Sequence, residues 1–170
     1  LAIRGGEPVK AKPWPSWPVA DKRDAEAVAK VVLSGQWGRV MREKSLASEF
    51  ERKYADYQGS KYALMINGGG TQALEISFRA LDVGTGDEVI LPALGWVADV
   101  TSILMSGGIP IFVDVDLDTG NIDPNLIEDA ITNKTRAILP VHSGGRPCEM
   151  DRIMDIAKKH NLFVVEDAAH

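Results

Sequence analysis

The sequence is poor in cysteine, in long apolar runs and in clustered basic residues, and each absence excludes a class of protein. Cys148 is the only cysteine among 170 residues, so the chain has no disulfide framework and no cysteine-ligated zinc site, and a cytoplasmic location is expected. The longest apolar runs are about five residues, whereas a membrane-spanning helix needs about 20. The net charge is −5 and no stripe of lysine and arginine occurs, which argues against nucleic acid or a membrane as the main partner.

Residues 1–60 are expected to form an N-terminal arm followed by two helices. Trp14 and Trp17 alternate with three prolines between residues 10 and 19, which favours an extended segment. This arm would dock on its own domain or on a partner subunit, or serve as a proline-rich ligand of another domain. Asp21 can cap a helix that ends near residue 33, and the apolar spacing of residues 45–57 predicts a second helix.

From residue 61 onward, short apolar runs alternate with amphipathic segments. The pattern predicts strands at 62–66, 88–91, 109–115, 137–141 and 162–166, and helices at 71–81, 97–105, 124–131 and 150–160. Such alternation is typical of an α/β fold with three layers, in which helices cover both faces of a mainly parallel sheet. Ligands of these sheets bind beyond the carboxyl ends of the strands, so each loop that follows a strand is a candidate site.

A glycine-rich turn at residues 67–71 lies between a predicted strand and a predicted helix. Glycines let the backbone approach a ligand, and the free N–H groups of a helix N-terminus favour an anion, so Gly70 and Thr71 are candidate phosphate ligands. A plain tight turn with a helix cap is the alternative. The spacing also fits a dinucleotide-binding pattern, but the acidic residue that this pattern requires after the next strand is missing. A mononucleotide P-loop is excluded because no lysine follows the last glycine.

Two groups of potential metal ligands are better explained without a metal. The aspartates of residues 114–118 alternate as in a calcium loop, but Thr119 and Asn125 stand where glycine and glutamate are required, which favours a solvated turn. Glu166, Asp167 and His170 have no identifiable further ligand nearby in the sequence. No metal site is therefore expected.

Three residues on strand-end loops carry the chemistry. Asp167 follows an apolar strand, where a buried carboxylate is costly unless an arginine or the protonated ring nitrogen of a cofactor pairs with it. Trp96 follows another strand and could cover a flat ligand or pack in the core. His142 lies on the same rim, as a ligand contact or as a histidine hydrogen-bonded within its loop. A phosphate-binding turn, an aromatic ring and a buried acid are together the parts of a pyridoxal phosphate site.

Six motifs occur in an order that resembles the DegT/DnrJ/EryC1/StrS aminotransferases. They are Gly70-Thr71-Gln72-Ala73-Leu74, Gly86-Asp87-Glu88-Val89-Ile90-Leu91-Pro92, Trp96-Val97-Ala98, Val113-Asp114-Val115-Asp116, Pro140-Val141-His142 and Glu166-Asp167-Ala168-Ala169-His170. The resemblance covers essentially the whole chain. It implies the aspartate aminotransferase fold, which is fold type I of the pyridoxal-phosphate enzymes, and places the N-terminal part of the cofactor-binding large domain at residues 61–170.

Residue by residue, the resemblance implies a set of roles. The backbone of Gly70 and Thr71 would bind the cofactor phosphate, and Trp96 would stack on the pyridine ring. Asp167, the expected catalytic residue, would pair with the protonated ring nitrogen, and His170 would contact the ring hydroxyl. The implied reaction transfers an amino group from glutamate or glutamine to a keto-sugar or keto-cyclitol in sugar or secondary-metabolite biosynthesis.

One family residue has no counterpart in these 170 residues. The Schiff-base lysine of the family lies beyond the strand of Asp167, so we expect the chain to be the N-terminal portion of a longer enzyme with the rest of the large domain and a small domain. A sugar dehydratase of the same family would carry another residue at that downstream position, and a cofactor-free binding or regulatory homologue is also open. A homodimer is expected, since aminotransferases of this fold bury their sites between two subunits.

Overall fold

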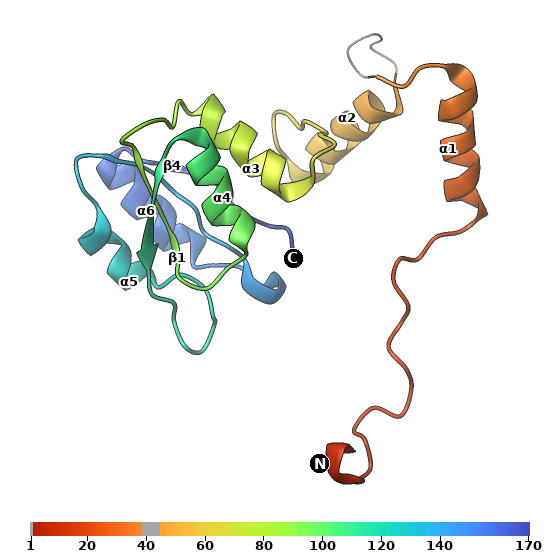
Figure 1. The fold of residues 1–170 in the computed structure, drawn as a ribbon, viewed down its shortest axis with the longest axis horizontal. Coiled ribbons are helices and arrows are strands. Elements are labelled where there is room, and N and C mark those ends of the chain that lie inside the picture. The colour runs from red at the N-terminus through yellow and green to blue at the C-terminus, as the bar shows by residue number, and fades with distance from the viewer. Residues whose placement is uncertain (1, 39–44) are drawn as a thin grey trace. The chain divides into compact units, whose positions relative to one another are not determined.

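The computed structural model describes residues 2–38 and 45–170, and the chain divides into two compact units (Figure 1). The first unit spans Leu1–Met65 and the second spans Ile66–His170. None of the helices within the described ranges combines the length and apolar character that crossing a membrane requires.

Both predicted helices of the first unit are confirmed. Helix α1 spans Lys22–Ser34, with the Asp21 carboxylate accepting from the N–H of Arg23 at its start and Gly35 in the left-handed region at its end. Helix α2 spans Leu46–Gln58 and begins after a serine hydroxyl that accepts the N–H of Ser48. These caps satisfy backbone groups that have no partner inside a helix. Because the capping residues are recognisable in the sequence, the ends of both helices could be predicted closely.

The arm before α1 contains one short 3₁₀ turn, Ala2–Arg4, and is otherwise irregular up to residue 21. Trp14 and Trp17 are both strongly exposed. The Lys10 ammonium lies 3.3 Å from the centroid of a Trp14 ring. Two exposed tryptophans leave a large apolar area in contact with solvent in the isolated chain.

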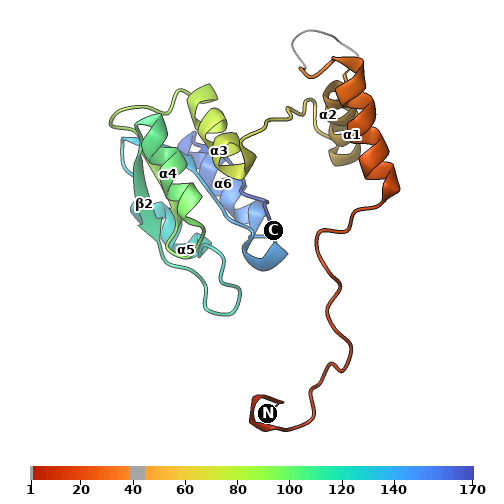
Figure 2. The same ribbon diagram turned by 45° about the vertical axis from the view of Figure 1, so that its right-hand side comes forward.

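The second unit contains a parallel sheet of four strands in the order β2-β1-β3-β4. Its helices and strands are α3 (Gly69–Ala80), β1 (Glu88–Pro92), α4 (Val97–Ser106), β2 (Ile109–Val113), α5 (Pro124–Ile127), β3 (Thr135–Ile138), α6 (Met150–His160) and β4 (Phe163–Val164). Helices α3 and α4 lie on one face and helices α5 and α6 on the other (Figures 1 and 2). The predicted three-layer α/β architecture is thereby confirmed.

The core consists of two apolar clusters, one on each face of the sheet. Val89 and Leu91 of β1 pack with Phe78 on the side of α3 and α4, whereas Ile90 between them packs with Ile153 on the side of α6. This alternation follows from the two-residue period of a strand. Full burial of such side chains stabilises the fold by roughly 1.5–3 kcal/mol each. Because both faces are covered, the strands read as continuous apolar runs rather than alternating ones.

The prediction of a strand at residues 62–66 is wrong. This segment forms no strand, and the N–H of Met65 donates to the Glu51 carboxylate at 2.8 Å instead of to a neighbouring strand. A strand is stable only when its backbone groups pair with another strand, and none of the described residues provides one for this segment.

Several other elements differ in length from the predictions, among them β2, which ends at Val113 and not at residue 115. Strand β3 ends at Ile138, before Pro140, which has no N–H to donate to the sheet. Strand β4 contains only Phe163–Val164. The predicted helix at 124–131 is divided into α5 and a 3₁₀ turn, Glu128–Ala130. Beyond the two short strands the parallel pairing continues as an isolated bridge between Val141 and Asp167.

Candidate active site

A cavity of about 460 Å³ lies in the second unit, where the loops that follow the strands meet the start of α3. Small-molecule sites typically measure about 300–1,000 Å³, so this cavity has the size of a cofactor site. All five site residues predicted from the sequence line it, namely Gly70, Thr71, Trp96, Asp167 and His170. The structure therefore brings together residues that are up to 100 positions apart in the chain.

One wall of the cavity is the N-terminus of α3. Gly68 precedes the helix without any side-chain cap, and Gly69 has a φ of 67°, a left-handed conformation that favours glycine. Gly70 and Thr71 belong to the first turn, whose N–H groups have no acceptor inside the helix. An uncapped helix N-terminus that opens into a cavity is a ready site for an anion such as phosphate.

Trp96 stands directly before α4 on a second wall. The residue is 72% exposed in this chain, so the ring is not part of the core. Its backbone N–H donates to Oδ2 of Asp99 at 2.9 Å, which fixes the turn that carries the ring. An uncovered indole at the rim of a cavity is available to stack on a planar ligand.

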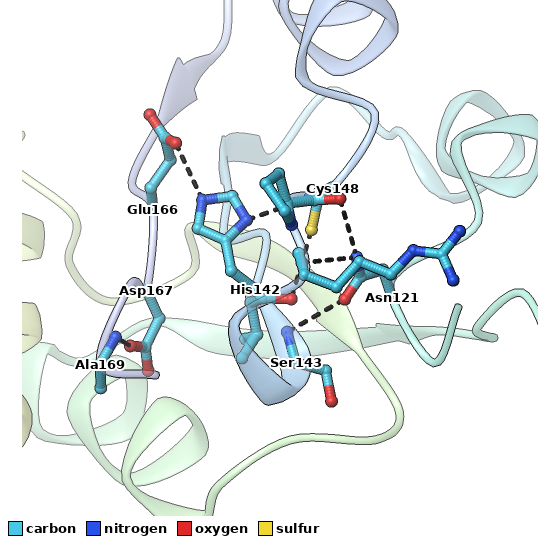
Figure 3. Close-up of polar contacts among 10 residues, drawn as sticks. Asn121, His142, Ser143, Cys148, Glu166, Asp167 and Ala169 are labelled. Atoms are coloured by element: carbon cyan, nitrogen blue, oxygen red, sulfur yellow. Dashed lines mark hydrogen bonds and ion pairs between the residues drawn. The ribbon is translucent and has the colours of Figure 1, made fainter.

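Asp167 is positioned by its backbone. Its N–H donates to the carbonyl oxygen of Pro140 at 2.9 Å, and its own carbonyl accepts the N–H of His142 at 3.0 Å. The carboxylate accepts the N–H of Ala169 at 2.9 Å (Figure 3). No lysine or arginine of the described residues forms an ion pair with this carboxylate. Asp167 is thus a half-buried acid at the cavity that has no lysine or arginine partner among the described residues. Such an acid suits a ligand that brings its own positive charge.

His142 is hydrogen-bonded at both ring nitrogens (Figure 3). Nδ1 accepts the N–H of Cys148 at 3.1 Å, so in the neutral ring the hydrogen is on Nε2, which donates to the Glu166 carboxylate at 3.0 Å. Of the two interpretations left open by the sequence, this geometry favours the histidine bonded within its loop. His142 thus lines the cavity while both of its nitrogens stabilise the cavity wall.

Asn121 is a structural residue of the site that the sequence analysis missed. It is 3% exposed, its Oδ1 accepts the N–H of Ser143 at 3.0 Å, and its Nδ2 donates to the carbonyls of Arg146 and Pro147 at 2.9 and 3.1 Å. These bonds hold the loop between β3 and α6 (Figure 3). Its position after a polar turn gave no signal of this role, because the partners lie more than 20 residues away.

The two regions considered for metals carry other interactions. The Asp116 carboxylate accepts the N–H groups of Asp118 and Thr119, at 3.1 and 2.9 Å, which is the hydrogen-bonded turn predicted from the sequence. Nδ1 of His170 accepts the N–H of Gly144 at 3.1 Å. Within residues 2–38 and 45–170, no group of three histidine, cysteine or acidic side chains is arranged to hold a metal ion.

Asp99 is a second residue that the sequence analysis missed. It lies in the first turn of α4 and is 2% exposed. Burial, followed by hydrogen bonding with the Asp167 carboxyl, raises the pKa of Asp99 to about 7. A Cβ on the neighbouring Gly95 would lie 2.8 Å from Oδ2 of Asp99, so a side chain at this position would displace the Asp99 carboxylate. The one available signal was an acid inside the otherwise uncharged segment 97–106.

Comparison with known proteins identifies the family. The model of the DegT/DnrJ/EryC1/StrS aminotransferase family matches residues 18–170. The chain belongs to this family. It is 41% identical over 177 residues to the L-glutamine:scyllo-inosose aminotransferase of Streptomyces griseus, an alignment that covers 100% of this chain and 41% of that relative. The chain thus spans about two fifths of the length of the curated relatives that it matches.

Solved structures of family members have the same fold. The chain superposes on 3-amino-5-hydroxybenzoic acid synthase with a TM-score of 0.88 and 34% identity, covering 95% of this chain and 41% of that one. It matches NtdA of Bacillus subtilis, solved with bound pyridoxamine phosphate, with a TM-score of 0.75 and 35% identity over 87% of this chain and 34% of that one. The family depends on pyridoxal phosphate, and the present site fits that cofactor. The uncapped helix N-terminus suits its phosphate. The Asp167 carboxylate, which forms no ion pair with a lysine or arginine of the described residues, suits a cationic ring nitrogen.

Proposed function

We propose that the parent enzyme is a pyridoxal-phosphate-dependent aminotransferase that transfers an amino group from glutamine or glutamate to a keto-sugar or keto-cyclitol in sugar or secondary-metabolite biosynthesis. The observation that carries the proposal is the convergence of the α3 N-terminus, Trp96 and Asp167 on one cavity. The name of the Streptomyces griseus relative, which pairs L-glutamine with scyllo-inosose, supports the substrate class.

In this proposal the five predicted residues of the cavity each contribute to binding the cofactor. The N–H groups of Gly70 and Thr71 bind the phosphate, and the Thr71 hydroxyl adds a donor. Trp96 covers one face of the ring, which excludes water from that face. His170 contacts the ring hydroxyl. The cofactor, when bound, supplies an electron sink for the carbon that exchanges the amino group.

Asp167 has the central task. An ionised carboxylate facing the ring nitrogen stabilises the proton on that nitrogen, because opposite charges at short range favour the charged forms of both groups. The carboxylate already accepts the N–H of Ala169, so its orientation is partly fixed by the backbone. A charge held in place before the reaction costs no reorganisation during it.

The proposal assigns residues 1–60 to the arm and its helices and 61–170 to the first part of the cofactor-binding domain. The lysine that binds the cofactor, the remaining large domain and a small domain would belong to the parent protein. The residue at that lysine position separates an aminotransferase from a dehydratase of the same family. A cytoplasmic location is part of the proposal, since the chain contains a single cysteine.

We also propose that the parent protein is a homodimer. The exposed Trp14 and Trp17 support this, because a partner subunit would cover the apolar area that they leave in solvent. Obligate dimers bury on the order of 2,000 Å² or more. Sedimentation of the full-length protein is expected to give a dimer at micromolar concentration, and a stable, active monomer would exclude it.

The experiment that tests the proposed reaction uses the full-length protein loaded with pyridoxal phosphate. L-glutamine alone should convert the bound cofactor to its pyridoxamine form in a single turnover, seen as a loss of the visible absorbance band. Adding scyllo-inosose as a keto-cyclitol should restore the band and yield an aminated product by mass spectrometry. A band that glutamine and glutamate both leave unchanged would contradict an aminotransferase, and a protein that binds no cofactor would indicate the cofactor-free homologue.

A further inference from the structure

Asp99 is a buried acid that the proposed reaction leaves without a role. Its Oδ2 accepts the N–H of Trp96 at 2.9 Å, as an acidic residue in the first turn of a helix commonly does. Its other oxygen, Oδ1, is fully buried, and no donor of the described chain bonds to it. Capping therefore accounts for the hydrogen bond of Oδ2, but it gives no reason for the burial of Oδ1.

A buried oxygen without a partner is rare enough to require a cause. Leaving such a group unsatisfied is costly, and native structures contain few of them. An exposed acid would serve equally well as a cap, so capping does not account for the burial of Asp99. Trp96 and Ala98, which shortly precede Asp99 in the chain, line the same cavity as Asp167. The Asp167 carboxyl acts on Asp99 through hydrogen bonding and through its negative charge.

We propose that Asp99 is a positioning residue whose protonated carboxyl donates a hydrogen bond to the Asp167 carboxylate and so fixes the oxygen that Asp167 presents to the cofactor ring nitrogen. The inference rests on the proposed function, since it requires a cationic ring nitrogen at Asp167. The pair holds one proton on Asp99 and one negative charge on Asp167, and no bond breaks when the ligand binds.

The surroundings of the pair are consistent with this arrangement. Oδ1 of Asp167 is held by the N–H of Ala169, so a donor from α4 would provide the second contact that defines the plane of the carboxylate. The raised pKa of Asp99 keeps much of it protonated near neutral pH. The other titratable side chains lining the cavity in the described chain are His142 and His170, which are bonded to other groups.

Three variants separate positioning from a structural role. Asp99→Asn keeps the shape and offers an amide N–H to Asp167, so it should substitute for the protonated acid. Asp99→Leu removes the donor, and Asp99→Ala repeats that test with a smaller side chain in case the leucine variant does not fold. Ser106→Ala is the matched control, because Ser106 is also buried on α4 but bonds only within its helix, to the Ser102 carbonyl at 2.9 Å.

The test measures binding of pyridoxamine phosphate, labelled with ¹⁵N in the ring, to the full-length protein. The nitrogen chemical shift reports whether the ring nitrogen is protonated, and a pH titration gives the pH at which it loses its proton. We expect Asp99→Leu and Asp99→Ala to bind about tenfold more weakly and to lose the ring proton about one pH unit lower than the wild type. Asp99→Asn and Ser106→Ala should stay within about threefold of the wild type in affinity.

Three other results would overturn the inference, and one of them would also overturn the proposed function. A leucine or alanine variant with the wild-type ring-nitrogen titration would overturn the inference and leave the proposed function intact, even if its melting temperature falls. An asparagine variant as impaired as the leucine variant would also overturn it. A wild-type protein that binds no pyridoxamine phosphate would overturn the proposed function, and the inference with it.

Discussion

The backbone N–H of His142 donates to the carbonyl oxygen of Asp167 at 3.0 Å, which joins the loop after β3 to the segment after β4. A second bond, from the N–H of Asp167 to the carbonyl of Pro140 at 2.9 Å, extends the parallel pairing past the end of both strands. The position of the acid is thus set by the sheet and not by its side chain. A substitution at Asp167 should therefore alter chemistry with little effect on the fold.

Asp167→Asn is expected to lower turnover by about ten- to a hundredfold. An amide cannot stabilise the proton on the ring nitrogen, and a charge-assisted hydrogen bond contributes roughly 1.5–3 kcal/mol. The measurement is steady-state turnover of the full-length enzyme, with a thermal melt to show that the fold is retained. Asp155→Asn, at an exposed position on α6, is the matched control. Near-wild-type turnover in Asp167→Asn would refute the pairing.

Thr71→Val is expected to weaken pyridoxal phosphate binding by about three- to tenfold. The substitution removes the hydroxyl donor at the α3 N-terminus but keeps the backbone N–H groups that supply most of the anion site, so the loss is partial. Equilibrium titrations of the full-length protein with pyridoxal phosphate and with pyridoxal provide the comparison. Affinity for pyridoxal should not change, since it has no phosphate. An equal loss for both compounds would place the phosphate elsewhere.

Asp99→Asn should change how the stability of the cofactor-free protein depends on pH. The pKa of Asp99 is raised from 3.8 to about 7, so between these values the folded state holds a proton that the unfolded state has released. The wild type therefore loses free energy of unfolding as pH rises from about 4 to about 7, on the order of a few kcal/mol at most. Asp99→Asn has no carboxyl to ionise at this position, so its free energy of unfolding should not fall in this way between about pH 4 and about pH 7.

Thermal melts of both proteins at pH 5 and pH 8 measure the difference. The asparagine variant should gain stability relative to the wild type at pH 8, and the gain should shrink at pH 5. A constant difference between the two proteins over this range would show that Asp99 ionises normally.

His142→Ala is expected to lower the free energy of unfolding by about 1–3 kcal/mol, because it leaves the N–H of Cys148 without an acceptor in the interior of the loop. His142→Asn supplies a side-chain oxygen close to the position of Nδ1 and should recover most of this loss, although it gives up the contact with Glu166. Chemical denaturation of the full-length protein compares them. If the asparagine variant is no more stable than the alanine variant, the Cys148 contact does not stabilise the loop.

The helices could be predicted well because their limits are encoded locally. Asp21 and Gly35 cap α1 through contacts within three residues, and α6 was predicted at its observed bounds, Met150–His160. The limits of a strand depend on the neighbouring strands with which its backbone pairs. Residues 62–66 have the composition of a strand but no pairing partner among the described residues, and β4 is short although its apolar run is long.

Part of the candidate site could be predicted from the sequence, because some of its residues occupy recognisable positions at the ends of strands or helices. Trp96 and Asp167 were found because a parallel sheet brings its strand-end loops to one edge, so that their positions after strands indicate convergence. Gly70 was found from the glycine-rich turn before a helix, although the strand predicted ahead of that turn does not form. Asp99 and Asn121 were missed because their importance comes from burial and from partners far away in the chain. No local pattern reveals that an acid on a helix interacts with an acid 68 positions further along the chain.

The central claim is that the cavity between α3, Trp96 and Asp167 holds pyridoxal phosphate, and a calorimetric titration of the full-length protein with this cofactor tests it most directly. The account predicts one site per subunit with micromolar or tighter affinity, weakened by Asp167→Asn and unaffected by Asp155→Asn. Absence of saturable binding, or binding that Asp167→Asn leaves unchanged, would contradict it.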